Sequence, residues 1–466
     1  MNWTPVLKKG NGPIYLAICD AIARDIMERR LPPGSKLPPH RDLAHKLKVT
    51  VGTVARAYAE ATSLGLIVGE VGRGTFVNDY GSQKDETTRL AVEEVVSPKI
   101  IDLGLNLSAV GEAEVLLRST LRNLSRLDSL EALLRYQPGA GMVSHRIIAS
   151  QWLDKFGVRT HPENLVISNG GQHGLLLSLM AVAGHGDSIA TEALTYPGVK
   201  AVAHQLGIHL NPVQMDKDGL DPHALTELCE SRRPKAIYCM PTLQNPTTVT
   251  MSEDRVRQIA AIAAKYGLWI IEDDVYGFLS HERPPTLASL LPERTVYLTS
   301  ASKSMAPGLR VGFIACPPEL SKTIQELSMM TDWMSPPLMA EIATSWIACG
   351  YADQLINWHR QQAAERQRLA RQILGQPENG SISCYHLWMN LPEQWRMDSF
   401  SAAALRVGVR VITADAFSVK RDHAPHAVRL CLGAAYTLQQ IDSALVKLKQ
   451  LADSKPRPLM DLQMVR

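Results

Sequence analysis

The sequence predicts a small α+β domain joined to a large α/β domain, which carries a smaller α+β subdomain near its C-terminal end. Two observations predict this arrangement. Residues 1–80 contain three helical patterns followed by two short strand-like runs around a glycine-rich turn. From about Ile101 onward, apolar strand-like runs alternate with helical patterns, which is typical of a largely parallel sheet covered by helices.

The N-terminal segment has apolar residues at helical spacing over Ile14–Arg29, ahead of a Pro-Pro-Gly turn. Further helices are predicted over Arg41–Leu47 and from Thr50, as the N-cap, to about Ser63. Two short strands, residues 66–68 and 75–77, flank a Gly-Arg-Gly turn and form a hairpin. Three helices and a hairpin within residues 8–79 predict a winged helix-turn-helix domain.

A polar, charged segment without periodicity follows, and it predicts a linker over residues 80–99. The large domain is expected over 100–455, with its smaller subdomain from about 340 to 455. Its predicted helices include Gly171–Ala183, Asp254–Tyr266 and Leu438–Ala452. Its predicted strands include Leu165–Ile167, Ala236–Met240, Leu268–Ile271, Val296–Leu298 and Val311–Ala315.

Composition excludes several classes of protein. With 45% hydrophobic and 20% charged residues, the 466-residue chain is typical of globular proteins, not of disordered, collagen-like or coiled-coil ones. The seven cysteines are scattered without a CxxC pair, which favours a reducing compartment and predicts no metal site. The longest apolar stretch, Leu175–Ala183, is far shorter than the ~20 residues of a bilayer span. We therefore expect a cytoplasmic protein without membrane contact.

Charge is unevenly distributed along the chain. Residues 1–80 hold 11 of the 49 Lys and Arg but only 7 of the 46 Asp and Glu, a net charge of +4. The remainder has a net charge of −1. A small basic domain ahead of a large neutral one indicates a nucleic-acid-binding end.

Three stretches of the basic domain resemble GntR-type regulators: Lys36–Ala44 their second helix, Val49–Tyr58 their recognition helix and Gly72–Val77 their wing. The resemblance implies double-stranded DNA as partner. The expected DNA contacts are Arg41, Thr50, Gly52, Thr53, Arg56, Arg73 and Gly74. The family often has Arg where this chain has Val51, so one direct base contact is either missing or replaced by Arg56. The alternative is that these charges only form a solvated helix face.

The string Ser300–Gly312 resembles the lysine motif of fold-type I aminotransferases. Lys303 follows a predicted strand and can form a Schiff base with an aldehyde cofactor. Ser300, Ser302 and Arg310 are expected to hold the phosphate of that cofactor. The resemblance identifies the cofactor as pyridoxal 5'-phosphate.

Two further stretches match the same family. In Ile270–Tyr276, Asp273 is expected to pair with the pyridine nitrogen and Tyr276 to bond the ring 3-oxygen, while Asp274 is the less favoured choice for the ring. The turn Asn245-Pro246-Thr247 places Asn245 as the second donor to that oxygen, although the family's next Gly is Thr248 here.

Four more residues are assigned by the resemblance. Gly171 and Gln172 open a helix after a strand and are expected to contact the phosphate. Tyr196 falls where the family stacks a ring on the cofactor, although ordinary loop chemistry is the alternative for all three. Arg429 is expected to bind a substrate or effector carboxylate as a planar fork, with a buried ion pair as the alternative.

A GntR-type reader followed by an aminotransferase-like domain resembles the MocR family of regulators. This resemblance implies a homodimeric, PLP-dependent transcriptional regulator that senses PLP or a small amino compound. The rival interpretation is an active aminotransferase with an accessory DNA-binding domain, because no part of the transaminase set is missing. A third, a DNA-binding protein with an inert cofactor domain, is disfavoured because Lys303 is intact.

Overall fold

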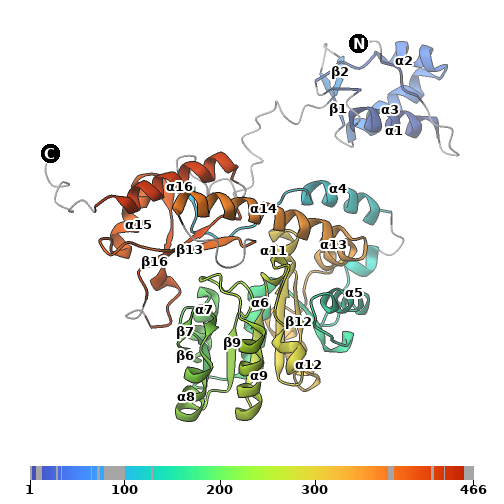
Figure 1. The fold of residues 1–466 in the computed structure, drawn as a ribbon. Coiled ribbons are helices and arrows are strands. Elements are labelled where there is room, and N and C mark those ends of the chain that lie inside the picture. Colours follow the sequence, from blue (N-terminus) through green and yellow to red (C-terminus); the bar gives the residue numbers. More distant parts are fainter. Residues whose placement is uncertain are drawn as a thin grey trace, which may run out of the picture. The chain divides into compact units, whose positions relative to one another are not determined.

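The computed structural model describes residues 3–6, 13–27, 30–32, 34–63, 66–70, 74–77, 100–126, 130–375, 383–420, 424–434 and 436–455. The chain divides into two compact units, residues 1–95 and 96–466 (Figure 1). The linker expected over 80–99 lies outside the described residues. In the stretches that are described, no helix is long and apolar enough to cross a membrane.

The first unit consists of three helices and a hairpin, as predicted: α1 (Ile14–Met27), α2 (His40–Leu47), α3 (Val51–Ser63), β1 (Ile67–Glu70) and β2 (Gly74–Val77). Thr50 caps α3 as expected, because its Oγ1 accepts from the backbone N–H of Thr53 at 3.1 Å. Buried Ile18, Leu43 and Val54 bring the three helices into one core with the hairpin.

The second unit is built on a seven-stranded sheet in the order β4-β12-β11-β10-β9-β5-β6. Its strands are β4 (Leu165–Ser168), β12 (Gly312–Ala315), β11 (Thr295–Ser300), β10 (Trp269–Asp273), β9 (Ala236–Cys239), β5 (Ser188–Glu192) and β6 (His209–Val213). Only β12 in this sheet runs antiparallel to its neighbours, so the sheet is largely parallel, as predicted. The carboxyl ends of the parallel strands therefore share one edge.

Helices cover both faces of this sheet (Figure 1). Tyr238 and Ile271 pack into one core and Ile237 and Ile270 into the other, because successive side chains on a strand alternate between faces. The helices of the large part are α4 (Ala113–Leu124), α5 (Val143–Asp154), α6 (Gly170–Val182), α7 (Pro197–Leu206), α8 (Pro222–Arg232), α9 (Glu253–Tyr266), α10 (Leu287–Leu290), α11 (Ala301–Ser304), α12 (Pro318–Thr331), α13 (Pro337–Ala348) and α14 (Tyr351–Leu374).

A smaller sheet, in the order β13-β16-β15, forms the C-terminal subdomain with α15 and α16. Its elements are β13 (His386–Asn390), α15 (Met397–Arg406), β14 (Val409–Arg410), β15 (Ile412–Thr413), β16 (Ala427–Cys431) and α16 (Leu438–Asp453). The short strand β3 (Ile101–Asp102) joins it by pairing with β14. A separate hairpin consists of β7 (Met215–Asp216) and β8 (Gly219–Leu220), and short 3-10 turns span Leu130–Leu133, Pro162–Asn164, Gly277–Leu279, Pro307–Leu309 and Ala414–Ala416.

The subdomain core begins later along the chain than the boundary expected near residue 340. Helix α13 and the first half of α14 pack in the main core, and the second core takes residues from Ala370 onward. The reason is that the 24-residue helix α14 is long enough to serve both cores. The second core also takes Leu103, from the beginning of the unit.

Candidate functional site

A cavity of about 580 Å³ lies at the carboxyl ends of β9, β10 and β11, where ligands commonly bind in open α/β sheets. Asp273 and Ser300 are the last residues of β10 and β11, and Lys303 follows in α11. The structure brings all eleven predicted cofactor and carboxylate residues to this one cavity: Gly171, Gln172, Tyr196, Asn245, Asp273, Tyr276, Ser300, Ser302, Lys303, Arg310 and Arg429.

Asp273 accepts a hydrogen bond from Tyr238, a residue that the sequence analysis did not identify. Tyr238, fully buried on β9, donates its hydroxyl to Asp273 Oδ2 at 2.7 Å. The strand register pairs Tyr238 with Ile271, so Tyr238 shares a sheet face with Asp273 two residues further on. Burial raises the pKa of Asp273 to about 6, and the hydrogen bond from Tyr238 opposes that rise.

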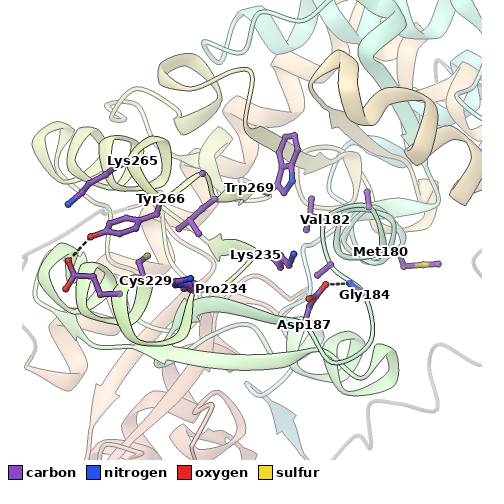
Figure 2. Close-up of a pocket in the computed structure, with 16 residues that line it drawn as sticks. Met180, Val182, Gly184, Asp187, Cys229, Pro234, Lys235, Lys265, Tyr266 and Trp269 are labelled. Atoms are coloured by element: carbon purple, nitrogen blue, oxygen red, sulfur yellow. Dashed lines mark hydrogen bonds between the residues drawn. The ribbon is translucent and has the colours of Figure 1, made fainter.

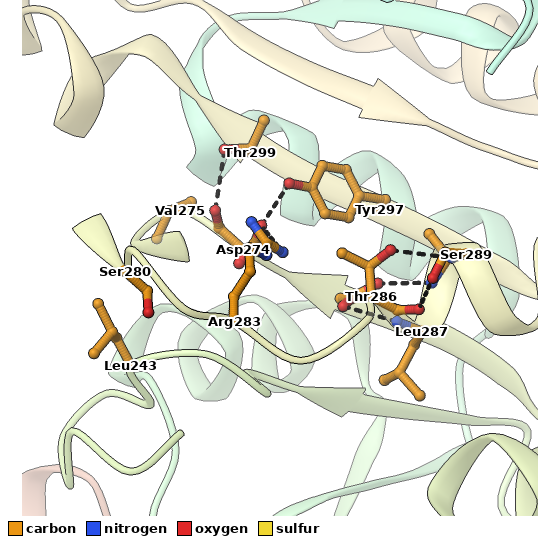
Figure 3. Close-up of polar contacts among 12 residues, drawn as sticks. Leu243, Asp274, Val275, Ser280, Arg283, Thr286, Leu287, Ser289, Tyr297 and Thr299 are labelled. Atoms are coloured by element: carbon orange, nitrogen blue, oxygen red, sulfur yellow. Dashed lines mark hydrogen bonds and ion pairs between the residues drawn. The ribbon is translucent and has the colours of Figure 1, made fainter. Parts of the chain in front are cut away.

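The neighbouring carboxylate, Asp274, is bound by side chains that do not line the cavity. Figure 3 shows it bound by Arg283 and Tyr297, and its Oδ2 accepts from Arg283 Nη2 at 2.8 Å and from Tyr297 Oη at 2.5 Å. Asp274 does not line the cavity, whereas Asp273 does. This favours Asp273 over Asp274 as the partner of a ring nitrogen.

Arg429 orients the amide of Asn245. Its Nη1 donates to Asn245 Oδ1 at 2.8 Å and its Nη2 to the carbonyl oxygen of Gly104 at 2.7 Å, and the guanidinium lies over the ring of Phe417. Because the Asn245 oxygen accepts from Arg429, its amide nitrogen is left to donate. The Nε of Arg429 is buried and has no partner among the described residues.

A second group of residues at this cavity has the features of a phosphate site. Helix α6 begins there with Gly170, and its first-turn N–H groups lack helical acceptors. Gly170 has φ +79°, and a Cβ at this position would lie 2.8 Å from Arg310 Nη2, so glycine is favoured here. With the described residues Arg310 makes two long contacts, 3.4 Å to Ser302 Oγ and 3.4 Å to the Asn169 carbonyl, and so keeps donors for an anion.

Lys303 lines the same cavity, and its amine is suited to nucleophilic chemistry. Burial, together with the charges of Arg429 and Arg310, lowers its pKa to about 8. Its Nζ donates to the backbone carbonyl of Asn106. The neutral fraction of this amine near physiological pH is therefore far larger than that of an ordinary lysine with a pKa of about 10.4, and the neutral form is the one that forms an imine.

The segment Gly104–Ser108 also lines the cavity, and the sequence analysis did not assign it a role. Besides the contacts from Lys303 and Arg429, Asn106 Nδ2 donates to Tyr276 Oη at 2.7 Å and Ser108 Oγ donates to the Ser302 carbonyl at 3.0 Å. The ends of the segment belong to the subdomain side: β3 pairs with β14, and Ala109 N donates to the Gly433 carbonyl. The segment thus connects the subdomain to the chemical centre.

A larger hollow, about 1020 Å³, lies at the opposite, amino ends of β5, β9 and β10 (Figure 2). It contains Arg233, Lys235 and Lys265, while Glu230 accepts from Tyr266 and Asp187 from the Gly184 N–H. None of the predicted site residues lines it. We therefore place the chemistry at the carboxyl-end cavity.

In the first unit, the predicted DNA contacts Arg41, Thr50, Gly52, Arg56 and Gly74 are exposed and Thr53 is half-buried; Arg73 lies outside the described residues. Arg56 stacks on the ring of Tyr15, 4.2 Å from its centroid. Gly74, at φ +122°, leaves room for the Lys36 side chain, so its conformation explains the glycine. The roles of these residues in DNA binding stay predictions.

The Tyr238–Asp273 contact leads to a testable expectation. In Tyr238→Phe, Asp273 loses its donor and its pKa rises further, so fewer molecules carry the anion that attracts a protonated ring nitrogen. We expect the cofactor dissociation constant to rise by about tenfold or more, since a hydrogen bond to a charged group contributes about 1.5–3 kcal/mol. The loss should be larger at pH 6 than at pH 8, as measured by equilibrium dialysis.

Tyr297→Phe is the matched control, because Tyr297 is as buried as Tyr238 but donates to Asp274. Equal losses of cofactor affinity in the two variants would show that the Tyr238 contact has no specific role.

Comparisons with known proteins agree with this geometry. Residues 14–77 match the bacterial regulatory protein family gntR, and residues 98–448 match aminotransferase class I and II. The chain is 31% identical over 454 residues to YdeF of Bacillus subtilis, named an uncharacterized HTH-type transcriptional regulator, with 97% of both chains covered.

Aminotransferases match the second unit. Aromatic-amino-acid aminotransferase 1 of Thermococcus litoralis is 25% identical, over 62% of this chain and 73% of that protein. The crystal structure of an archaeal alanine:glyoxylate aminotransferase has a TM-score of 0.70 at 26% identity and covers 78% of this chain and 92% of that one. Both resemblances predicted from the motifs are confirmed.

Proposed function

This chain belongs to the bacterial gntR regulators that carry a class I and II aminotransferase domain, the MocR type, and we propose that it senses a small amino compound through the pyridoxal phosphate of that domain. The observation that carries this proposal is that all the residues predicted to bind the cofactor line one cavity, in a chain that also matches the gntR family. The ligand would change the affinity of the protein for its operator.

The residues of the cavity fit the cofactor. Asp273 would keep the ring nitrogen protonated, and Asn245 Nδ2 and the Tyr276 hydroxyl would both donate to the ring oxygen. The start of α6, Ser300, Ser302 and Arg310 would hold the phosphate, and Tyr196 would stack on the ring. Two buried polar atoms of cavity residues, Asn106 Oδ1 and Arg429 Nε, have no partner among the described residues. When bound, the cofactor supplies an aldehyde for amines and a ring that withdraws electrons.

We expect a bound ligand to change the hydrogen bonds that Lys303 and Arg429 make in the cavity, and this change would be the basis of sensing. With the cofactor bound, the Lys303 nitrogen would be engaged by its aldehyde, and an amine that takes the place of Lys303 there would free it to donate to the Asn106 carbonyl again. A ligand carboxylate at Arg429 would compete with Asn245 Oδ1 and the Gly104 carbonyl. Both exchanges act on the segment Gly104–Ser108, whose ends pair with the C-terminal subdomain. A ligand that favours one arrangement of this segment shifts the equilibrium between arrangements.

The functional unit we propose is a homodimer in the cytoplasm. Leu134, Tyr136, Met330 and Trp333 are exposed, and the rings of Tyr136 and Trp333 meet edge to face at 5.9 Å. Contiguous exposed apolar side chains of this kind favour burial against another protein surface. A second copy of the chain is the occupant we propose.

The second candidate is an active aminotransferase with an accessory DNA-binding domain. It is supported by the lowered pKa of Lys303 and by an intact carboxylate-binding Arg429. Both candidates use the same cavity and the same cofactor. They differ in whether the ligand leaves as a keto acid or changes DNA binding.

One experiment separates them. The full chain, loaded with cofactor, first selects duplexes from a randomised DNA pool, and amino acids are then added while DNA affinity and keto acid formation are both followed. We expect a change in DNA affinity on the time scale of binding. Rapid conversion of amines to keto acids with unchanged DNA affinity would identify the enzyme and reject the regulator.

A further inference from the structure

The wall of the cavity next to Arg429 is apolar. Leu105, Leu107 and Ile412 line it, and Leu105 and Leu107 remain 40% and 47% exposed. Large aliphatic side chains this exposed at the lining of a cavity gain most when a ligand covers them. Ile412 is adjacent to Arg429 in the smaller sheet, paired with it directly.

Each charged side chain that lines the cavity already has an expected partner on the cofactor or on the ligand carboxylate. Among the described lining residues, only Asp273, Lys303, Arg310 and Arg429 have side chains that carry a full charge. With the cofactor in place, Asp273 faces the ring nitrogen, Arg310 the phosphate and Lys303 the aldehyde carbon. Arg429 alone is left, and it suits one carboxylate.

Among the described residues of this chain, a ligand with a second charge would find no partner in this part of the cavity. A distal carboxylate needs another cation, and a distal ammonium needs another acid, yet the described lining offers neither beyond the four groups already assigned. Moving an unpaired charge out of water against leucine and isoleucine is strongly unfavourable. An uncharged side chain meets no such cost.

We propose that the ligand is an α-amino acid with an uncharged, apolar side chain, which lies against Leu105, Leu107 and Ile412 while its carboxylate binds Arg429. This inference rests on the function proposed above, because it assumes the cofactor and the role of Arg429. It makes Leu105 and Leu107 specificity-determining residues. Since both flank Asn106, the ligand side chain contacts the same segment that holds Lys303.

The test compares four probes on the cofactor-loaded full chain: L-leucine, L-phenylalanine, L-glutamate and L-lysine. Dissociation constants come from the visible absorption of the bound cofactor and, independently, from the shift in thermal midpoint. We expect L-leucine or L-phenylalanine to bind at least about tenfold more tightly than the two charged amino acids, the low end of what one pocket contact contributes.

A charge introduced into the wall should change that order. In Leu107→Arg the new guanidinium can pair with a distal carboxylate, and we expect the preference for L-leucine over L-glutamate to fall by about tenfold, the low end for close charge pairs. Leu405→Arg is the matched control, because Leu405 is 43% exposed on α15 and does not line the cavity. Its preference should equal that of the unmodified protein.

Results that contradict the apolar-ligand inference can be told apart from results that contradict the proposed function. Tighter binding of L-glutamate or L-lysine by the unmodified protein, or no binding of any probe, would overturn the inference. So would equal effects of Leu107→Arg and Leu405→Arg. Covalent cofactor attachment at Lys303 and binding of selected DNA are measured on the same preparation, and their loss would instead overturn the proposed function.

Discussion

Replacing Lys303 with alanine is expected to abolish covalent attachment of the cofactor after borohydride reduction. Lys303 is the only lysine among the described residues that line the cavity, so no neighbouring amine can replace it. Noncovalent binding should persist in weakened form, since Arg310 and the start of α6 are unchanged. Mass spectrometry of the reduced protein measures the attachment directly.

Lys322→Ala is the matched control, because Lys322 is a highly exposed lysine on α12 and does not line the cavity. It should be labelled as fully as the unmodified protein. Equal labelling of Lys303→Ala and Lys322→Ala would remove Lys303 from the role proposed for it.

The rate of attachment should also report the lowered pKa of Lys303. In cofactor-free protein the neutral fraction of this amine reaches one half at about pH 8 and levels off above about pH 9. The attachment rate should follow the same curve. An ordinary lysine, with a pKa of about 10.4, would give a rate that keeps rising well beyond pH 9.

The second large effect is expected in DNA binding, which should weaken steeply with salt. If the first unit neutralises about six to ten phosphates, affinity falls by about 10³–10⁵ between 50 and 200 mM salt. Arg41→Ala should weaken binding on all sequences alike and reduce the log–log slope by about one. Arg118→Ala, an exposed arginine on α4 of the other unit, is the control. Salt-insensitive binding would contradict the assignment of the first unit as the DNA reader.

Most residues of the candidate cofactor site could be predicted because they lie in short, contiguous sequence motifs. The lysine string and the Asp-x-x-Tyr stretch each follow a strand, and the carboxyl ends of parallel strands meet at one edge. The sequence could therefore place Asp273, Tyr276 and Lys303 together before the structure did.

Tyr238 and Asn106 could not be found in this way. In the sequence Tyr238 looks like any other residue of a buried strand. Only the register between β9 and β10 shows that it lies on the same sheet face as Asp273. Asn106 lies in a loop with no local motif, and its importance depends on contacts with Tyr276 and Lys303, 170 and 197 residues away in sequence. The division between the cores was equally hidden, since nothing local in α14 marks where its packing changes.

Ligand binding at Arg429 and DNA binding by the first unit are expected to be coupled, and a thermodynamic cycle measures this coupling. Operator affinity is measured with and without the amino acid, and amino acid affinity with and without operator DNA. We expect both to change by the same factor, consistent with about 1–3 kcal/mol of coupling, and Arg429→Ala to lose the effect of α-amino acids while still retaining the cofactor and binding DNA. Affinities that do not depend on each other in the unmodified protein would contradict the claim.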